Sequence, residues 1–100
     1  NQQKIVLARW MHLNTPILIL EDPTAGVDVG ARAEIYDLLN KALGEGIAII
    51  VISTDFEEIA HLCNRALIFN RGEIAGELKN EGITFGNLLA LASDSQSKVA

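Results

Sequence analysis

The sequence predicts an α/β fold in which a parallel strand-helix-strand unit is followed by an antiparallel hairpin and a terminal helix. Two short, unbroken apolar runs, residues 17–20 and 47–52, have the composition of strands that are buried on both faces of a parallel sheet. A segment with helical spacing of its apolar residues lies between them. Asn70-Arg71-Gly72, further along, is typical of a hairpin turn.

The first predicted element is a helix over residues 2–13. Its apolar side chains recur around most of the helical surface, as expected for a helix inside a larger body, and Asn14-Thr15-Pro16 ends it. The chain begins with Asn1, and no strand or capping residue precedes this helix. We therefore expect the chain to be a piece of a longer protein.

The next elements form the parallel unit. The strand over residues 17–20 ends in two acids, and a turn at residues 26–30 leads into a helix that Asp28 is expected to cap and Gly44 to end. The strand over residues 47–52 completes a right-handed crossover, so the two strands should be parallel. The face of the helix that should pack on the sheet consists of Ala31, Ile35, Leu38, Leu39 and Ala42.

The remaining elements follow the second strand. Asp55 and Glu58 have the spacing of a capping box, which predicts a short helix that runs to about Cys63. Strands over residues 66–69 and 73–77 should form the hairpin. Thr84 is expected to cap a last helix over residues 85–92, and residues 93–100 form a polar tail.

Composition limits the classes of function. The chain has 100 residues, of which 49% are hydrophobic, so it is expected to form at most one globular domain. Its net charge of -5 and its scattered basic residues argue against binding to nucleic acid or to an anionic membrane. One cysteine excludes an internal disulfide, and no apolar run approaches the roughly 20 residues of a membrane span. We expect a soluble intracellular chain.

Polar side chains follow both predicted parallel strands. Glu21 and Asp22 end the first strand, and Thr54 follows the second. Ligands of open parallel sheets bind outside the carboxyl ends of the strands, where these residues should meet. Adjacent carboxylates repel each other unless a proton or a cation intervenes, and Mg²⁺ prefers such oxygen ligands. The alternative interpretation is a plain turn, because Asp-Pro often begins one.

Three motifs in order resemble the nucleotide-binding subunit of ATP-binding cassette (ABC) transporters. They are Asn1-Gln2-Gln3-Lys4, Leu7-Ala8-Arg9-Trp10 and Leu20-Glu21-Asp22-Pro23-Thr24-Ala25-Gly26-Val27-Asp28-Val29-Gly30. The resemblance is greatest to the second ATPase half of bacterial ribose-type monosaccharide importers, and it extends over residues 1–92. It implies the C-terminal half of a P-loop NTPase domain, with residues 93–100 as a tail.

The resemblance also implies roles for single residues. Asn1 would directly follow the family's signature motif, and Glu21 would hold the Mg²⁺ of MgATP through water. Asp22 would be the general base that activates the attacking water, and Thr54 would stand at the switch-histidine position. The D-loop, which contacts the opposite ATPase half, would comprise Ala25, Gly26, Val27 and Asp28.

The chain departs from the family pattern in two ways at these positions. The family has Asp then Glu at the end of the strand, whereas this chain has Glu21 then Asp22, and Thr54 cannot supply an imidazolium. A misplacement of about 1 Å can cost on the order of 100-fold in rate, so weak hydrolysis is expected. The chain also contains no Gly-x-x-x-x-Gly-Lys-[Ser/Thr] phosphate loop, no glutamine loop and no signature. The isolated chain is therefore expected not to bind ATP usefully.

The resemblance implies part of an ATPase subunit that powers sugar import, on the cytoplasmic face of the inner membrane. Its partners would be a second nucleotide-binding half, the membrane permease subunits and, indirectly, a periplasmic sugar-binding protein, with no nucleic acid. Two alternatives stay open: a catalytically degenerate regulatory or remnant module, and a Mg²⁺-dependent phosphoacceptor domain of the response-regulator kind. The hairpin at Asn70-Arg71-Gly72 disfavours the phosphoacceptor.

Overall fold

The structure of the chain, a computed structural model, describes the backbone of residues 17–97 and the side chains of residues 17–93. The helix that the sequence predicts over residues 2–13 lies outside the described residues. The chain divides into two compact units, the first ending at Thr54 and the second beginning at Asp55. The sequence analysis had not predicted this division.

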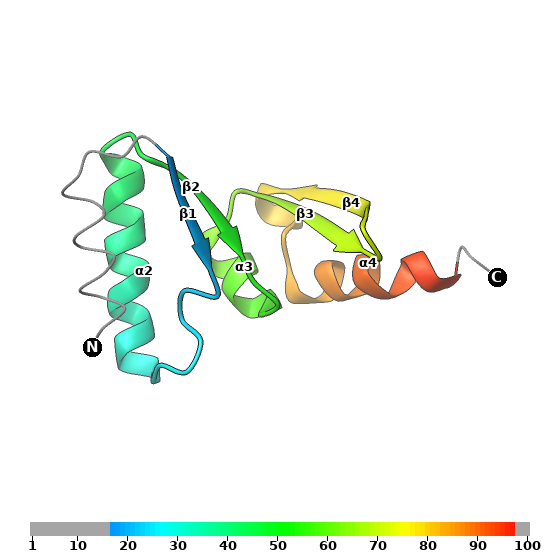
Figure 1. Cartoon of the computed structure of the whole chain (residues 1–100), viewed down its shortest axis with the longest axis horizontal. Helices are drawn as coiled ribbons and strands as arrows, with labels where there is room; N and C mark the ends of the chain where they lie inside the picture. The colour runs from blue at the N-terminus through cyan, green and yellow to red at the C-terminus, as the bar shows by residue number, and fades with distance from the viewer. Residues whose placement is uncertain (1–16, 98–100) are drawn as a thin grey trace. The chain divides into compact units, whose positions relative to one another are not determined.

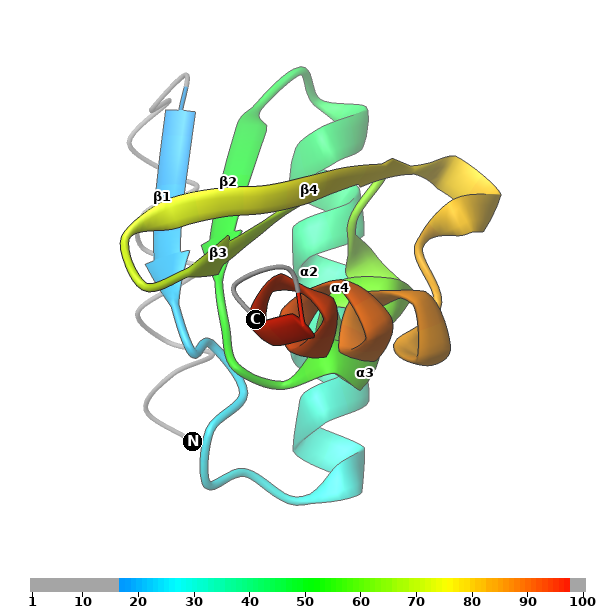
Figure 2. The same ribbon diagram turned by 90° about the vertical axis from the view of Figure 1, so that its right-hand side faces the viewer.

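The first unit contains the predicted strand-helix-strand arrangement. Strand β1 (Ile17–Glu21) is followed by helix α2 (Val29–Gly44) and strand β2 (Ala48–Ile52). The strands pair in parallel, in a register that sets Ile17 opposite Ala48 and Glu21 opposite Ile52. Figures 1 and 2 both show α2 along one face of this two-stranded sheet.

The core of the first unit lies between the sheet and α2. Leu18 of β1 is buried, and α2 contributes the buried side chains of Ile35, Tyr36, Leu39 and Ala42. Burial of a side chain the size of Leu or Ile contributes roughly 1.5–3 kcal/mol, so this helix face holds the unit together. Tyr36 was not among the predicted core residues.

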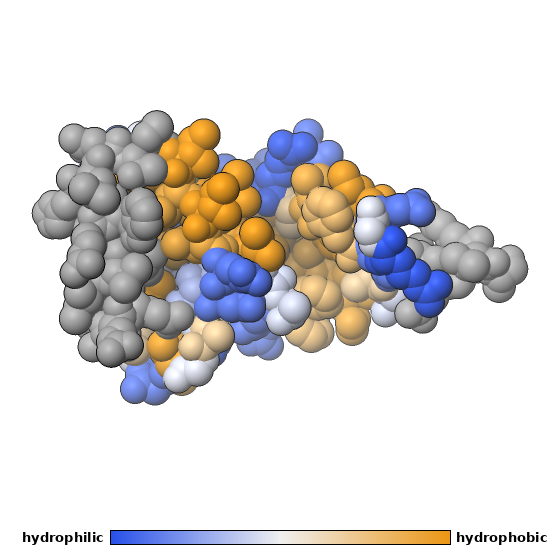
Figure 3. Space-filling model, viewed as in Figure 1, coloured by the Kyte–Doolittle hydropathy of each residue, from blue (hydrophilic) through white to orange (hydrophobic). Residues whose placement is uncertain are grey.

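The other face of the sheet is apolar and exposed. Its largest side chains are Ile17, Ile19, Ile50 and Ile52, which are 54%, 63%, 51% and 53% exposed. Ile19 and Ile50 are paired across the two strands, so the exposed side chains are neighbours. In Figure 3 hydrophobic atoms gather over β1 and β2. Within residues 17–97, one helix layer covers this sheet, and the expectation that both of its faces are covered stays a prediction.

Helix α2 begins as predicted and ends differently. The side chain of Asp28 caps its first turn. Gly44 is still helical, and the left-handed residue after the helix is Gly46, at a φ of 91°. The amide of Gly46 donates to the carbonyl of Leu43 at 3.1 Å. The predicted stop was thus two residues early, because a glycine at the second position beyond the last helical residue takes the left-handed conformation here.

The second unit contains helix α3 (Phe56–Leu62), strands β3 (Arg65–Asn70) and β4 (Glu73–Lys79), the short 3-10 helix η1 (Asn80–Gly82) and helix α4 (Phe85–Ser97). The two strands form the predicted antiparallel hairpin, with an irregularity in register after Ile68. Helix α4 packs against this hairpin and against α3.

Two predicted helix caps are present in the second unit. The carboxylate of Asp55 accepts hydrogen bonds from the amides of Glu57 and Glu58 at 3.1 and 3.3 Å. The hydroxyl of Thr84 accepts one from the amide of Asn87 at 3.1 Å. Helix α4 continues to Ser97, beyond the predicted end at residue 92. No glycine or proline interrupts that stretch, and adding residues to an existing helix is much easier than starting one.

The core of the second unit joins all of its main elements. Its buried apolar side chains are Ile59, Ala66, Ile68, Ile83 and Leu88. Glu58 is also buried, at 1% exposure. Gly76 of β4 approaches Leu91 of α4 so closely that a Cβ on residue 76 would lie 2.8 Å from the Leu91 side chain.

None of the helices within residues 17–97 has the length and hydropathy to span a membrane.

Candidate functional site

The carboxyl end of the parallel sheet brings the two predicted acids to the end of β2. Glu21 is the last residue of β1 and pairs with Ile52, the last residue of β2. The amide of Asp22 donates to the carbonyl of Ile52 at 2.7 Å. This bond extends the ladder by one step, so the acid doublet is fixed to the neighbouring strand by backbone contacts.

The strand period decides where the two carboxylates lie. Leu18 is buried and Leu20 is half-buried, whereas Ile17, Ile19 and Glu21 are exposed. Glu21 therefore belongs to the exposed face of the sheet, away from α2. Asp22 is half-buried and leaves the strand geometry, with a φ of 46° in the left-handed region.

Thr54 stands at the same edge of the sheet. It follows the last residue of β2 by two positions, and its side chain is exposed. Because β1 and β2 are parallel, their carboxyl ends share this edge, as the sequence predicted. The structure thus places Glu21, Asp22 and Thr54 at one edge of the sheet, all within the first unit.

A tight turn joins the acids to α2. The amide of Ala25 donates to the carbonyl of Asp22 at 3.1 Å, and the amide of Val27 donates to the carbonyl of Thr24 at 3.3 Å. Thr24 is buried, at 3% exposure, which the sequence analysis did not predict. A threonine two residues after the acids carried no pattern that would have shown its burial.

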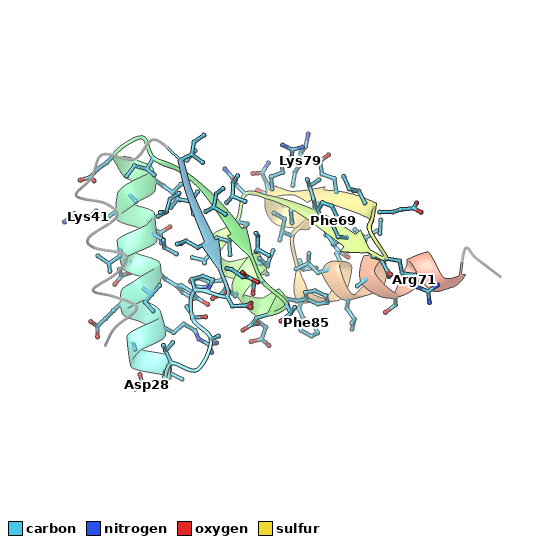
Figure 4. All side chains as sticks on the ribbon, in the orientation of Figure 1. Asp28, Lys41, Phe69, Arg71, Lys79 and Phe85 are labelled. Atoms are coloured by element: carbon cyan, nitrogen blue, oxygen red, sulfur yellow. The ribbon has the colours of Figure 1, made fainter. Side chains whose placement is uncertain are left out.

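The predicted D-loop residues lie along the outer part of this turn. Ala25, Gly26 and Asp28 are exposed and Val27 is half-buried. Gly26 has a φ of 75°, a conformation that glycine adopts without strain. The Oδ1 atom of Asp28 accepts a hydrogen bond from the amide of Ala31 at 2.8 Å, at the start of α2 where Figure 4 labels Asp28.

Asn1, the remaining predicted site residue, lies outside the described residues.

The donor set fits a magnesium ion that is held mainly by water and phosphate. Between residues 17 and 97, no group of three or more His, Cys, Asp or Glu side chains could hold a metal ion. Mg²⁺ is commonly bound through one or two carboxylates, several waters and the phosphates of a substrate. Glu21 and Asp22 supply oxygen ligands of this kind, so they suit a metal that arrives with a nucleotide.

Comparison with known proteins gives close relatives over nearly the whole chain. The chain is 49% identical over 92 residues to the ribose import ATP-binding protein RbsA 3 of Rhizobium meliloti. It is 45% identical over 98 residues to RbsA of Cereibacter sphaeroides and 43% identical over 93 residues to RbsA of Shigella dysenteriae. These matches cover 92–98% of this chain but only 18–20% of the relatives. No protein-family model matches the chain.

Solved structures with the same fold are ATP-binding cassettes. The ADP conformation of MJ1267, an ATP-binding cassette of an ABC transporter, aligns with a TM-score of 0.74 at 18% identity. That alignment covers 94% of this chain and 35% of the other. A second structure of MJ1267 aligns with a TM-score of 0.72. The chain spans about a fifth of the length of the curated relatives it matches, and its sequence identity to them shows that it belongs to the ATP-binding cassette ATPase family.

Proposed function

We propose that the chain is the part of an importer's ATP-binding subunit that faces the metal and the attacking water, and that the subunit powers uptake of a monosaccharide. The observation that carries this proposal is the acid doublet at the carboxyl end of β1, fixed to the end of β2 by the Asp22-Ile52 hydrogen bond. The identity of 43–49% to ribose import ATP-binding proteins supports the choice of a sugar as cargo.

Each residue of the cluster has a role in this proposal. Glu21 would hold Mg²⁺, and Asp22 would accept a proton on its carboxylate from the water that attacks the terminal phosphate. Thr54, at the switch position, donates a hydrogen bond from its hydroxyl to the terminal phosphate. Mg²⁺, when bound, would supply positive charge against the phosphates of ATP. In this proposal Asn1 directly follows the signature motif. The D-loop residues contact a second ATPase half; they are Ala25, Gly26, Val27 and Asp28.

The proposal includes partners that complete the site. The phosphate loop, the glutamine loop and the signature are absent from this sequence, so other parts of the subunit supply them. The exposed apolar face of β1 and β2 supports this view, because parallel sheets occur almost only with both faces covered. We propose that the subunit works on the cytoplasmic face of the membrane with permease subunits, and indirectly with a periplasmic binding protein.

A chimera tests the proposal. In RbsA 3 of Rhizobium meliloti, this chain would replace the homologous 92 residues. We expect the chimera to fold, to bind ATP and to hydrolyse it, and Asp22→Asn to lower hydrolysis by about 100-fold or more, which is the range of general base catalysis. The isolated chain is expected to show no ATPase activity above buffer. A folded chimera that does not bind ATP would overturn the proposal.

The phosphoacceptor alternative is separated by a second measurement. The isolated chain is incubated with acetyl phosphate and Mg²⁺, and its mass is measured. We expect no change in mass. A stable acyl phosphate on Asp22 or Glu21 would favour a receiver-like domain over an ATPase part.

A further inference from the structure

Helix α4 exposes two large apolar side chains beside each other. Phe85 and Leu89 are 48% and 47% exposed, and they lie one turn apart on the same side of the helix. Leu88, between them in the sequence, is 2% exposed and belongs to the core of the second unit. Single exposed apolar side chains are ordinary, whereas neighbouring ones mark surfaces at which other molecules bind.

Small residues continue this side of the helix. Gly86 and Ala90 each follow one of the large apolar residues by one position, and both are exposed. Two helices pack closely where the residues between them are small, because the ridge of one helix then fits into the groove of the other. The exposed side of α4 thus has the shape that a second helix requires.

An aromatic pair extends the surface from α4 to α3. The rings of Phe56 and Phe85 meet edge to face, with centroids 6.1 Å apart and planes at 65°. Phe56 is half-buried, and Figure 4 labels Phe85 at the start of α4. Because this contact holds the ring of Phe85 in place, less conformational freedom is lost when a partner binds.

The charges along these elements are mainly negative. Asp55 and Glu57 flank Phe56 in the sequence, and Glu81 lies in η1, just before α4. Glu57 and Glu81 are exposed. Neither α3 nor α4 contains a lysine or an arginine, and Lys79, which precedes η1, is one cation against these three acids. A basic partner is therefore attracted, whereas a second copy of this surface or an anionic membrane is repelled.

We propose that this surface of α3 and α4 binds a basic amphipathic helix of a partner protein. Its residues are Phe56, Phe85, Gly86, Leu89 and Ala90. The partner's apolar side chains, spaced one turn apart, pack on Phe85 and Leu89, and its Lys or Arg side chains lie near Glu57 and Glu81. The surface belongs to the second unit and the acid doublet to the first, so this inference does not rest on the proposed function.

Calorimetric titration of the chain with a synthetic amphipathic helix of Leu and Lys tests the proposal. A peptide with Glu in place of each Lys is the charge control, and we expect it to bind about tenfold more weakly or not at all. Leu89→Gln should lower the affinity for the lysine peptide about tenfold, as for the central residue of an interface. Leu43→Gln, on a leucine of α2 that is 46% exposed, is the matched control and should leave the affinity unchanged.

Two further variants test how the peptide binds. Ala90→Phe adds apolar area but blocks the close approach of a helix, so we expect the affinity to fall about tenfold. A rise would show unspecific adhesion to apolar side chains and would overturn the proposal. Glu57→Gln combined with Glu81→Gln should lower the affinity about two- to fivefold and weaken its dependence on salt.

The chimera described above tests whether the rest of the subunit occupies the surface instead. The proposal is supported if the folded chimera binds the lysine peptide and Leu89→Gln weakens that binding as it does in the chain. A folded chimera that does not bind the peptide would show that the subunit itself covers the surface, which overturns the proposal. Equal binding of both peptides to the chain, or equal effects of Leu89→Gln and Leu43→Gln, would also overturn it. The binding of ATP to the chimera judges the proposed function separately.

Discussion

Asp28 shows how one side chain can serve both the fold and the proposed interface. Its Oδ1 atom caps α2 by accepting from the amide of Ala31 at 2.8 Å, and its residue is exposed. An N-cap of this kind is worth roughly 0.5–2 kcal/mol. The loop that would meet a second ATPase half is therefore also the loop that starts the helix, so its shape is fixed before any partner binds.

Cys63 provides a prediction about pH at the residue scale. Burial raises the pKa of the Cys63 thiol above its ordinary value of 9.0, and the nearby Glu58 carboxylate raises this pKa further. Because the thiolate is the form that iodoacetamide alkylates, we expect the midpoint of the alkylation rate's pH profile to lie above 9.0. Because the unfolded chain loses its thiol proton first, the free energy of unfolding should fall as pH rises past the ordinary thiol pKa.

Substitution of the neighbouring acid separates the two causes of the shift. Glu58→Gln should lower the pKa of the Cys63 thiol, so that the midpoint of the alkylation profile moves to lower pH. Glu57→Gln, on an exposed side chain of the same helix, is the matched control and should leave the profile in place. An alkylation midpoint at or below 9.0 in the wild-type chain would contradict the prediction.

At the scale of elements, the β3-β4 hairpin contains a residue that its turn does not favour. Arg71 and Gly72 join the paired residues Asn70 and Glu73, and both have positive φ, of 53° and 80°. Two positive values define a type I′ turn, which prefers Asn-Gly. Figure 4 labels Arg71 at this turn. Asn70 also donates from its side-chain amide to the carbonyl of Ala92 at 2.8 Å, which ties the turn to α4.

The turn predicts a stabilising substitution. Arg71→Asn should raise the free energy of unfolding by up to about 1 kcal/mol, because Asn adopts the left-handed region at lower cost than Arg. Gly72→Ala should lower it, since alanine is strained at a φ of 80°. Thermal unfolding of the three proteins checks this order. An unchanged or lower melting temperature for Arg71→Asn would mean that Arg71 makes contacts which offset its strain.

Features with local causes could be predicted from the sequence. The strands follow from apolar runs, and the caps at Asp28, Asp55 and Thr84 follow from residue type and position. The left-handed backbone of Asp22 could not be predicted in this way, because it depends on a hydrogen bond to Ile52, thirty positions away. The burial of Tyr36 and Thr24 likewise depends on packing between elements.

At the scale of the whole molecule, composition alone could not reveal the division into two units at Thr54. No glycine- or proline-rich linker marks that position, since Ser53-Thr54-Asp55 leads directly from a strand into a helix. The unbroken apolar runs indicate a sheet that is covered on both faces, but they do not show which segment covers the face opposite α2. The candidate site was easier to locate, since a parallel pair of strands necessarily places its carboxyl ends at one edge.

The exposed sheet face gives the last prediction. Ile19 and Ile50 are neighbours across the strands and more than half exposed, so we expect the isolated chain to self-associate through this apolar surface. Ile19→Lys with Ile50→Lys should reduce self-association in sedimentation and change the free energy of unfolding by no more than about 0.5 kcal/mol, as for exposed positions.

In the chimera the same pair should prevent folding, because there the face is proposed to be covered and buried lysines are costly. Leu43→Lys, at another exposed apolar position, is the control and should be tolerated in both proteins. A chimera that folds with both lysines in place would show that nothing covers this face.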